Sequence, residues 1–355
     1  MAETTLYILT LGILSLVFTF LIVLNGAMAI PNIKAKQEVE EVQSNVAVDA
    51  VSGSEDLPNV YLCIFDEYGG YDCLREYCDY DNEPFYTELK ERGFNVSYDS
   101  YGNSIRTEVE VSNLLNLDMV SLADDSYEAC LSRIEEPVLY QVMRKADYEI
   151  NYAGGGFLDP VGCEYVYNGE YESKEFSAEY YIMLNSAYYP FYKYVSDDEV
   201  GELQSHLNYV ANSYTLSDKN LFTVSYVCCP HIPWFVDENG QGIDASLREN
   251  WLERSTYLGQ LKYLNKLLLS MVDEILQNDP DSIIMLFSDH GFRCVTEGVE
   301  KYGVLDPKED QKYQMNILNA VYYRGEPLEN EGLSNYNTVR LLLNELLGTE
   351  YEMVG

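Results

Sequence analysis

The stretch SIIMLFSDHG, residues 282–291, decides the fold class. It begins directly after Asp279-Pro280-Asp281, which breaks a long helical pattern, and it is apolar without interruption from Ile283 to Phe287. A short continuous apolar run is typical of a strand buried on both faces, as in a parallel sheet covered by helices. The run ends at once in Asp289 and His290. The stretch therefore predicts a buried strand with chemically useful residues at its carboxyl end.

Two further segments have the same character, and helical patterns separate them. Asn59–Phe65 ends in Asp66-Glu67, and Leu221–Cys229 is followed by Pro230-His231. Strand–helix alternation with fully apolar strands predicts an α/β fold, an α/β/α sandwich around a mostly parallel central sheet. The remaining expected helices are Phe85–Arg92, Glu135–Ala146, Leu247–Gln277 and Tyr336–Leu347, and the remaining extended segments are Gly93–Val96, Tyr148–Tyr152 and Asn319–Tyr323.

The charge of the chain limits its ligands. The 355 residues carry a formal net charge of −37, which repels the phosphates of nucleic acids and of anionic bilayers. We therefore expect no nucleic-acid partner. An anionic substrate would require a metal ion or a few basic groups to reverse the field locally.

The eight cysteines do not form a disulfide framework. Cys63, Cys228 and Cys229 lie in apolar runs and are expected to be buried free thiols. Cys73 and Cys78 could form a bridge or remain free. No paired Cys-x-x-Cys elements with matching histidines occur, which argues against a structural zinc site.

The first 33 residues predict a transmembrane anchor, because no charged residue occurs from Thr4 to Ile33. A cleaved signal peptide is the alternative, since Ala27-Met28-Ala29 resembles a processing site. Residues 34–57 are polar and acidic and predict a linker. Lys34 and Lys36, taken alone, favour a cytoplasmic domain. Residues 58–350 form the expected catalytic domain.

The polar residues at the strand ends predict one metal site. Ligands of open α/β sheets bind beyond the carboxyl ends of the strands, where Asp66, Asp289 and His290 would supply two oxygens and an imidazole. This set suits Zn²⁺ or Mn²⁺, with Mg²⁺ or Ca²⁺ as alternatives. The chain has only three histidines. His206 lies in a polar helical segment and is expected at the surface, so the histidines needed for a second metal are missing.

A nucleophile is expected at the start of the helical pattern after residue 106. A threonine hydroxyl at a helix N-terminus beside a dication can ionise and attack, which makes Thr107 a candidate. The alternative for Thr107, on local sequence alone, is an N-cap.

In these residues the chain resembles the sulfatase-like, metal-dependent hydrolases and transferases of the alkaline phosphatase superfamily. The Pro-His-x-Pro-aromatic loop and the Ser-Asp-His-Gly strand end are specific in combination. The resemblance covers most of the chain after residue 58, in the segments NVYLCIFDEYGGYD (59–72), SIRTEVEVSNLLNLD (104–118), CPHIPWFVDENG (229–240), QLKYLNKLLLSMVDEIL (260–276), IIMLFSDHGFR (283–293), NILNAVYYRG (316–325) and NTVRLLLNELLG (337–348).

The resemblance implies roles for these residues. Asp66, Thr107, Asp289 and His290 would bind the metal, and Thr107 would also be the covalent nucleophile. His231 would contact the substrate oxyanion or protonate the leaving oxygen. By proximity we infer that Arg293 and Arg106 bind the transferring group. Glu67 is either a further ligand, a partner of His231 or an exposed loop residue.

Two departures from the family pattern narrow the chemistry. Sulfatases carry a Cys/Ser-x-Pro-x-Arg motif that is oxidised to formylglycine, whereas Glu-Val-Glu-Val follows Thr107 here. A threonine nucleophile is similar to that of phosphoethanolamine and phosphoglycerol transferases, which act at the outer face of the cytoplasmic membrane. Those relatives usually have several membrane helices, whereas this chain shows one. Glu108 and Glu110 are unfavourable neighbours for an anionic substrate.

The sequence therefore predicts an enzyme, a membrane-anchored transferase or hydrolase of a phospho-substituent in cell-envelope glycan modification. Its donor would be a phospholipid or other phosphoester and its acceptor a glycan or water. The domain would lie outside the cytoplasm on a single-pass anchor. Two alternatives remain: a sulfate or phosphate ester hydrolase on the same site, and a non-catalytic, membrane-tethered binding protein that keeps the fold.

Overall fold

The computed structural model describes residues 57–119, 126–154, 162–168, 199–244, 246–248, 250, 253–293 and 307–355. The predicted anchor and nearly all of the predicted linker lie outside the described residues. Within the described ranges, no helix is both long and apolar enough to cross a membrane.

The centre of the described structure is a seven-stranded sheet in the order β2-β7-β6-β1-β5-β3-β4. The five strands from β6 to β4 run parallel, while β7 is antiparallel to β6 and β2 is antiparallel to β7. The predicted mostly parallel sheet is therefore confirmed. The strands are β1 (Val60–Phe65), β2 (Asn95–Val96), β3 (Glu149–Ala153), β4 (Tyr165–Tyr167), β5 (Leu221–Val227), β6 (Ile283–Ser288) and β7 (Asn319–Tyr323).

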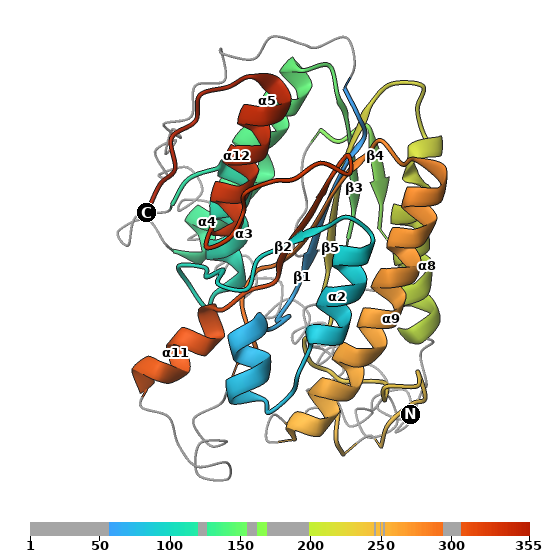
Figure 1. Cartoon of the computed structure of the whole chain (residues 1–355), viewed down its shortest axis with the longest axis vertical. Helices are drawn as coiled ribbons and strands as arrows, with labels where there is room; N and C mark the ends of the chain where they lie inside the picture. The colour runs from blue at the N-terminus through green and yellow to red at the C-terminus, as the bar shows by residue number, and fades with distance from the viewer. Residues whose placement is uncertain are drawn as a thin grey trace, which may run out of the picture.

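Helices cover both faces of this sheet (Figure 1). One layer contains α2 (Glu83–Glu91), α8 (Glu199–Asn212) and α9 (Arg254–Asn278). The opposite layer contains α3 (Thr107–Asn116), α4 (Tyr127–Glu135), α5 (Val138–Lys145) and α12 (Asn335–Leu347). Shorter elements are η2 (Cys73–Tyr77), η4 (Ser213–Thr215) and α11 (Pro307–Met315).

Burial on both faces explains why the central strands are continuously apolar. In β1, Tyr61, Cys63 and Phe65 pack in the core on the side of α2, α8 and α9. Val60, Leu62 and Ile64 alternate with them and pack on the side of α3, α5 and α12. Since successive strand side chains point to opposite faces, both alternating sets must be apolar.

Several local predictions are corrected. The helix expected over Glu135–Ala146 begins only at Val138, because Pro137 lacks the N–H that a continuous helix would use, and the helix α4 before it was not predicted. The helix expected from Leu247 begins at Arg254. His206 is fully buried on α8, not at the surface. Cys73 and Cys78 are both free thiols.

Candidate metal and nucleophile site

The site begins where two neighbouring strands end. β1 and β6 pair in parallel with Phe65 opposite Ser288, so the next residues, Asp66 and Asp289, leave the sheet side by side. Each of the two aspartates is only 4% exposed. Two neighbouring buried carboxylates repel each other unless a proton or a cation lies between them.

Each aspartate has one satisfied and one unsatisfied oxygen. Oδ1 of Asp289 accepts hydrogen bonds from the backbone N–H groups of Glu67 (3.1 Å) and His290 (2.8 Å). Oδ2 of Asp66 accepts a hydrogen bond from the Tyr226 hydroxyl at 2.8 Å. Oδ1 of Asp66 and Oδ2 of Asp289 are buried without a hydrogen-bond partner in the described structure. Unsatisfied buried oxygens are costly, and a bound ion would satisfy them.

His290 completes this group. Its Nδ1 lies 2.9 Å from the carbonyl oxygen of Gly291 and donates to it, which leaves the lone pair of Nε2 available. Nε2 lies 3.6 Å from Oδ1 of Asp66 and 3.7 Å from Oδ2 of Asp289. One ligand atom from each of the three residues lies within 4.8 Å of the others. Two hard oxygens and one imidazole fit a divalent ion.

Glycine is required beside His290. A Cβ atom on Gly291 would lie 2.4 Å from the backbone oxygen of Tyr313 and 2.7 Å from that of Asn316. Because both neighbours are main-chain atoms, the loop could not relax easily around a side chain. The close approach fixes the turn that orients the imidazole of His290.

Thr107 is the first residue of α3, and its hydroxyl faces the same group. Arg106, in an extended conformation, is the N-cap of α3, so the alternative prediction of Thr107 as N-cap is wrong. Thr107 Oγ1 lies 3.3 Å from Nε2 of His290. At this helix N-terminus the macrodipole favours a developing negative charge on the oxygen.

His231, Glu67 and Arg293 form a second layer of the site. Nδ1 of His231 donates to the carbonyl oxygen of Ile232 at 2.5 Å, while its Nε2 contacts the Arg293 guanidinium. Oε1 of Glu67 accepts from the backbone N–H of Arg293 at 2.7 Å. Glu67 is fully buried, so the reading of Glu67 as an exposed loop residue is wrong.

The electrostatics of the site are dominated by burial and by the paired carboxylates. Burial is the largest cause that raises the pKa of Asp289 to about 6, and the charge of Asp66 adds to it. Burial also acts to raise the pKa of Asp66, but His231, His290 and Arg293 outweigh it and leave that pKa lowered. Asp66 is therefore anionic at neutral pH, and the pair attracts a cation.

The acidic residues beside Thr107 have hydrogen-bond partners outside the metal-binding group. Glu108 pairs with Arg106, whose Nε lies 2.7 Å from its Oε1. Glu110 is buried and accepts a hydrogen bond from the backbone N–H of Asn103 at 2.8 Å, which braces the loop before α3. The Arg106 side chain is 39% exposed and pairs with Glu108. Its predicted role in substrate binding stays a prediction.

The mostly parallel sheet between two layers of helices is an alkaline phosphatase-like α/β fold. The chain belongs to the sulfatase family, because the model of that family matches residues 80–341. It is accordingly an enzyme of the sulfatase-like class. The matched range includes Thr107, His231 and Asp289 and begins after Asp66.

Solved structures share the fold at low sequence identity. The C-terminal periplasmic domain of EcEptC from Escherichia coli is 13% identical, with a TM-score of 0.56 over 85% of both chains. The same domain in complex with Zn gives a TM-score of 0.51 at 12% identity, over 83% of this chain and 84% of that one. Lipooligosaccharide phosphoethanolamine transferase A (EptA) from Neisseria meningitidis, an integral membrane protein, is 14% identical, with a TM-score of 0.53 over 90% of this chain and 61% of that one.

A lipoteichoic acid synthase is similar to the same degree. The lipoteichoic acid synthase LtaP from Listeria monocytogenes is 14% identical, with a TM-score of 0.52 over 91% of this chain and 79% of that one. At these identities the similarity shows the fold alone. No protein with curated function matches the chain in sequence.

Proposed function

We propose that the chain is a membrane-anchored, metal-dependent transferase or hydrolase that moves a phospho-substituent of the phosphoethanolamine or phosphoglycerol type. The observation that carries the proposal is the convergence of the Thr107 hydroxyl with three buried ligand atoms, two of them carboxylate oxygens that lack a hydrogen-bond partner. The names of the similar structures, a phosphoethanolamine transferase and a lipoteichoic acid synthase, support this substrate class.

The residues that would hold the metal are Asp66, Asp289 and His290, with the Thr107 hydroxyl as a fourth ligand. Once bound, a divalent ion supplies positive charge that lowers the pKa of the hydroxyl and offsets the charge of the phospho-group. The mixed oxygen and nitrogen set favours Mn²⁺ or Zn²⁺.

The proposed reaction is a two-step transfer. The ionised Oγ1 of Thr107 forms a bond to phosphorus while the bond from phosphorus to the leaving oxygen breaks. His231, whose pKa is raised because Asp66 and Glu67 outweigh the opposing effect of burial, donates the proton that the leaving oxygen needs. A glycan hydroxyl or water then forms a bond to phosphorus and gives its proton to the His231 imidazole, while the bond from phosphorus to Oγ1 of Thr107 breaks. Arg293 would pair with oxygens of the group in transfer.

The proposed placement follows from the sequence and is supported by the similar structures. Residues 1–33 would anchor the chain, residues 34–57 would form a linker, and the domain from residue 58 would lie outside the cytoplasm. The names of the similar structures, an integral membrane protein and a periplasmic domain, agree with this placement.

The proposal is tested with a generic phosphodiester in the presence of Mn²⁺, or of Zn²⁺ at no more than one equivalent. Thr107→Ala should abolish turnover, a loss of about a thousandfold or more, because it removes the attacking oxygen. Mass spectrometry of the stopped reaction should find a phospho-substituent on Thr107 in the wild-type protein. Thr87→Ala, a change at an exposed threonine of α2, is the matched control and should leave turnover unchanged. Activity that survives Thr107→Ala would remove the covalent mechanism.

One alternative substrate class is favoured by a specific observation, the match to the sulfatase family. A sulfate ester would meet the same nucleophile and the same metal ligands. Comparing turnover of matched aryl sulfate and aryl phosphodiester substrates on one preparation distinguishes the two classes. Higher kcat/KM on the sulfate would replace the phospho-transfer proposal.

A further inference from the structure

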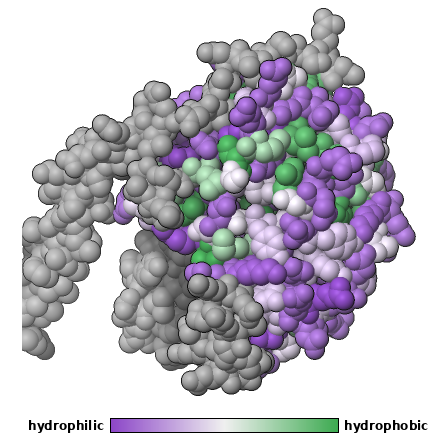
Figure 2. Space-filling model, turned by 60° about the vertical axis from the view of Figure 1, so that its left-hand side comes forward, coloured by the Kyte–Doolittle hydropathy of each residue, from purple (hydrophilic) through white to green (hydrophobic). Residues whose placement is uncertain are grey.

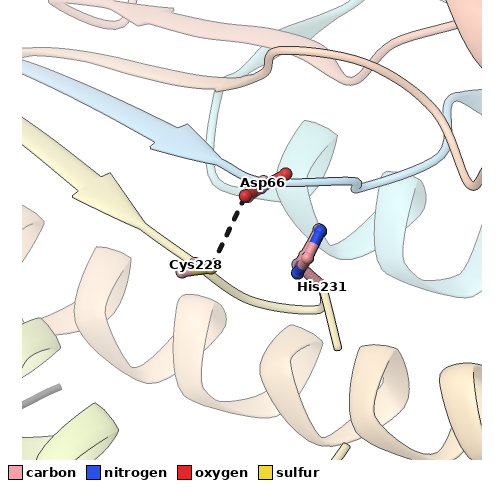
Figure 3. A group of neighbouring side chains, drawn as sticks. All are labelled: Asp66, Cys228 and His231. Atoms are coloured by element: carbon pink, nitrogen blue, oxygen red, sulfur yellow. Dashed lines mark hydrogen bonds between the residues drawn. The ribbon is translucent and has the colours of Figure 1, made fainter. Parts of the chain in front are cut away.

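A second group of potential ligands shares Asp66 with the first. Cys228 lies just after β5, and its Sγ donates to Oδ2 of Asp66 at 3.5 Å. Ligand atoms of Asp66, Cys228 and His231 all lie within 4.8 Å of one another. Figure 3 shows the two side chains of Asp66 and Cys228 turned toward each other, with His231 on the loop that follows β5. Asp66 thus has one oxygen toward each group.

A fourth side chain is directed at this second group. Oε2 of Glu67 is fully buried, has no hydrogen-bond partner in the described structure and lies 4.0 Å from Nε2 of His231. A buried carboxylate oxygen without a partner requires a cation or a donor. His231 presents Nε2 because its Nδ1 donates to the carbonyl oxygen of Ile232.

A positive group already occupies the edge of this pocket. The Arg293 guanidinium contacts Nε2 of His231, and its Nε lies 3.5 Å from Oε1 of Glu67. The position of the guanidinium shows that this group of side chains stabilises positive charge. It contacts the same imidazole nitrogen that a metal ion would need, so the guanidinium and an ion cannot both contact that nitrogen.

We propose that Asp66, Cys228 and His231, with Glu67 beside them, form a second divalent-cation site that selects thiophilic ions such as Zn²⁺. Asp66 bridges this site and the first one, on which the inference rests. Binding breaks the S–H bond of Cys228, releases the proton to solvent and forms a bond from sulfur to the ion. The Arg293 guanidinium moves off His231 when the ion binds.

The thiol sets the selectivity of the second site. Thiolate ligands favour Zn²⁺, whereas Mg²⁺, Ca²⁺ and Mn²⁺ prefer oxygen. Mn²⁺ should therefore fill the first site alone, and Zn²⁺ or Co²⁺ should fill both. Occupation of the second site uses the lone pair of His231 and displaces Arg293, so excess Zn²⁺ should lower turnover supported by Mn²⁺.

The test is a metal titration of the detergent-solubilised full-length chain after removal of metal by a chelator. The wild-type protein should bind two equivalents of Zn²⁺ but one of Mn²⁺, measured by elemental analysis after gel filtration. Co²⁺ should produce the near-ultraviolet charge-transfer band of a thiolate ligand. In Cys228→Ser the band should be lost and the Zn²⁺ stoichiometry should fall to one. Cys163→Ser, at another partly exposed cysteine, is the matched control and should change neither.

A second variant tests the proposed site independently of whether Cys228→Ser folds. Arg293→Ala removes the competing guanidinium and should tighten the second equivalent of Zn²⁺ about tenfold or more, which corresponds to about 1.4 kcal/mol. Circular dichroism verifies that both variants are folded. A single Zn²⁺ equivalent at saturation, or a cobalt–thiolate band that survives Cys228→Ser, would overturn the second site and leave the first intact. A wild-type protein that binds no divalent ion would instead overturn the proposed function.

Discussion

Among the residues of the site, Glu67 has an unusual backbone conformation that indicates a role for its side chain. Its φ of 64° is in the left-handed region, which costs a non-glycine residue about 1–3 kcal/mol. This conformation lets the backbone N–H donate to Asp289 while the carbonyl oxygen accepts from the Tyr257 hydroxyl at 2.9 Å. The side chain holds the backbone of Arg293. Glycine would remove the strain but also the carboxylate, so the strain indicates that the side chain is needed.

Glu67→Gln should lower kcat on a phosphodiester substrate about 10- to 100-fold, the range found when groups that orient metal ligands are changed. The amide keeps the size of the side chain but removes the charge opposite Arg293 and His231. KM for the metal-loaded enzyme should change less than kcat, because Glu67 positions groups that act in the transition state.

The matched control for this change is Glu88→Gln. Glu88 also pairs with an arginine, Arg92 at 2.7 Å, but on the exposed side of α2. An exposed pair contributes about 1 kcal/mol or less, and α2 carries none of the residues of the candidate site. Equal loss of kcat in the two variants would show that Glu67 has no special role.

At the scale of elements, the strands predicted from the sequence were those whose residue pattern follows from burial in the core. β1 and β6 are almost wholly apolar on both alternating faces because both faces are covered, and this pattern can be recognised in the sequence alone, whereas β5 carries Thr223 and Ser225 on one face. The helix expected over Glu135–Ala146 included Pro137, although proline favours a helix start over a helix interior, and α5 begins at Val138 directly after it. The antiparallel direction of β7 has no sequence signature, because a short apolar strand reads the same in either direction.

The candidate site was predictable where its ligands follow a strand directly. Asp66, Asp289 and His290 follow their strands directly, and the carboxyl ends of neighbouring parallel strands lie at the same edge of the sheet. The order of the strands in the sheet depends on tertiary packing. The contact between Asp66, after β1, and Cys228, after β5, was therefore not predicted. The count of histidines limited the expected metals to one, and it did not consider the Cys228 thiol on which the proposed second site depends. The sequence named Glu67 as a possible ligand or partner of His231, but it gave no sign of the left-handed backbone of this residue, which is set by its neighbours.

His206 shows how a polar residue can connect two elements. It lies on α8, and its Nε2 is 2.9 Å from the hydroxyl of Ser225 on β5. The sequence predicted exposure because polar residues surround it. Burial lowers its pKa to about 4 from an ordinary value of 6.5. The helix therefore packs on the sheet through a neutral imidazole.

This burial predicts a pH dependence of stability. Because the pKa of His206 is lower in the folded protein than in the unfolded chain, the unfolded chain binds the proton first. Stability should fall as the pH drops from 6.5 toward 4, by about 2 kcal/mol between pH 7 and pH 5 from this group. Urea unfolding of wild type and His206→Gln at both pH values measures the effect. The variant should lose about 2 kcal/mol less than wild type, and equal losses would contradict the assignment.

At the scale of the whole molecule, a chain with this acidic composition can bind the proposed anionic substrate only where the site itself carries positive charge. The chain carries −37 overall, and Figure 2 shows hydrophilic side chains over much of one face of the described part, around a group of apolar ones. Within the described residues, Arg293 places a positively charged guanidinium beside Glu67 at the site. A bound divalent ion would add the remaining positive charge, which couples substrate binding to metal loading.

The beginning of the domain is defined by contacts of the first described residues. Leu57 is 8% exposed, and the carbonyl oxygen of Pro58 accepts a hydrogen bond from Tyr148 at 2.7 Å. The side chain of Asn59 donates to Asp279 at 2.9 Å. At the other end, Asn337 and Val354 exchange hydrogen bonds of 2.8 and 3.0 Å, so the tail also packs on the domain. A chain of residues 54–355 therefore contains every packed residue that the structure describes.

Such a truncated chain should be soluble, fold and keep its metal-dependent turnover, whereas the full chain should pellet with membranes. The reason is that residues 4–33 lack charge and would be the sole anchor. Ultracentrifugation of both proteins, with sodium carbonate extraction of the pellet, measures the difference. A full-length chain recovered from the soluble fraction with its N-terminus after Ala29 would establish the cleaved signal peptide instead. A truncated chain that still pellets would show that a surface of the folded domain, and not the N-terminal segment, binds the membrane.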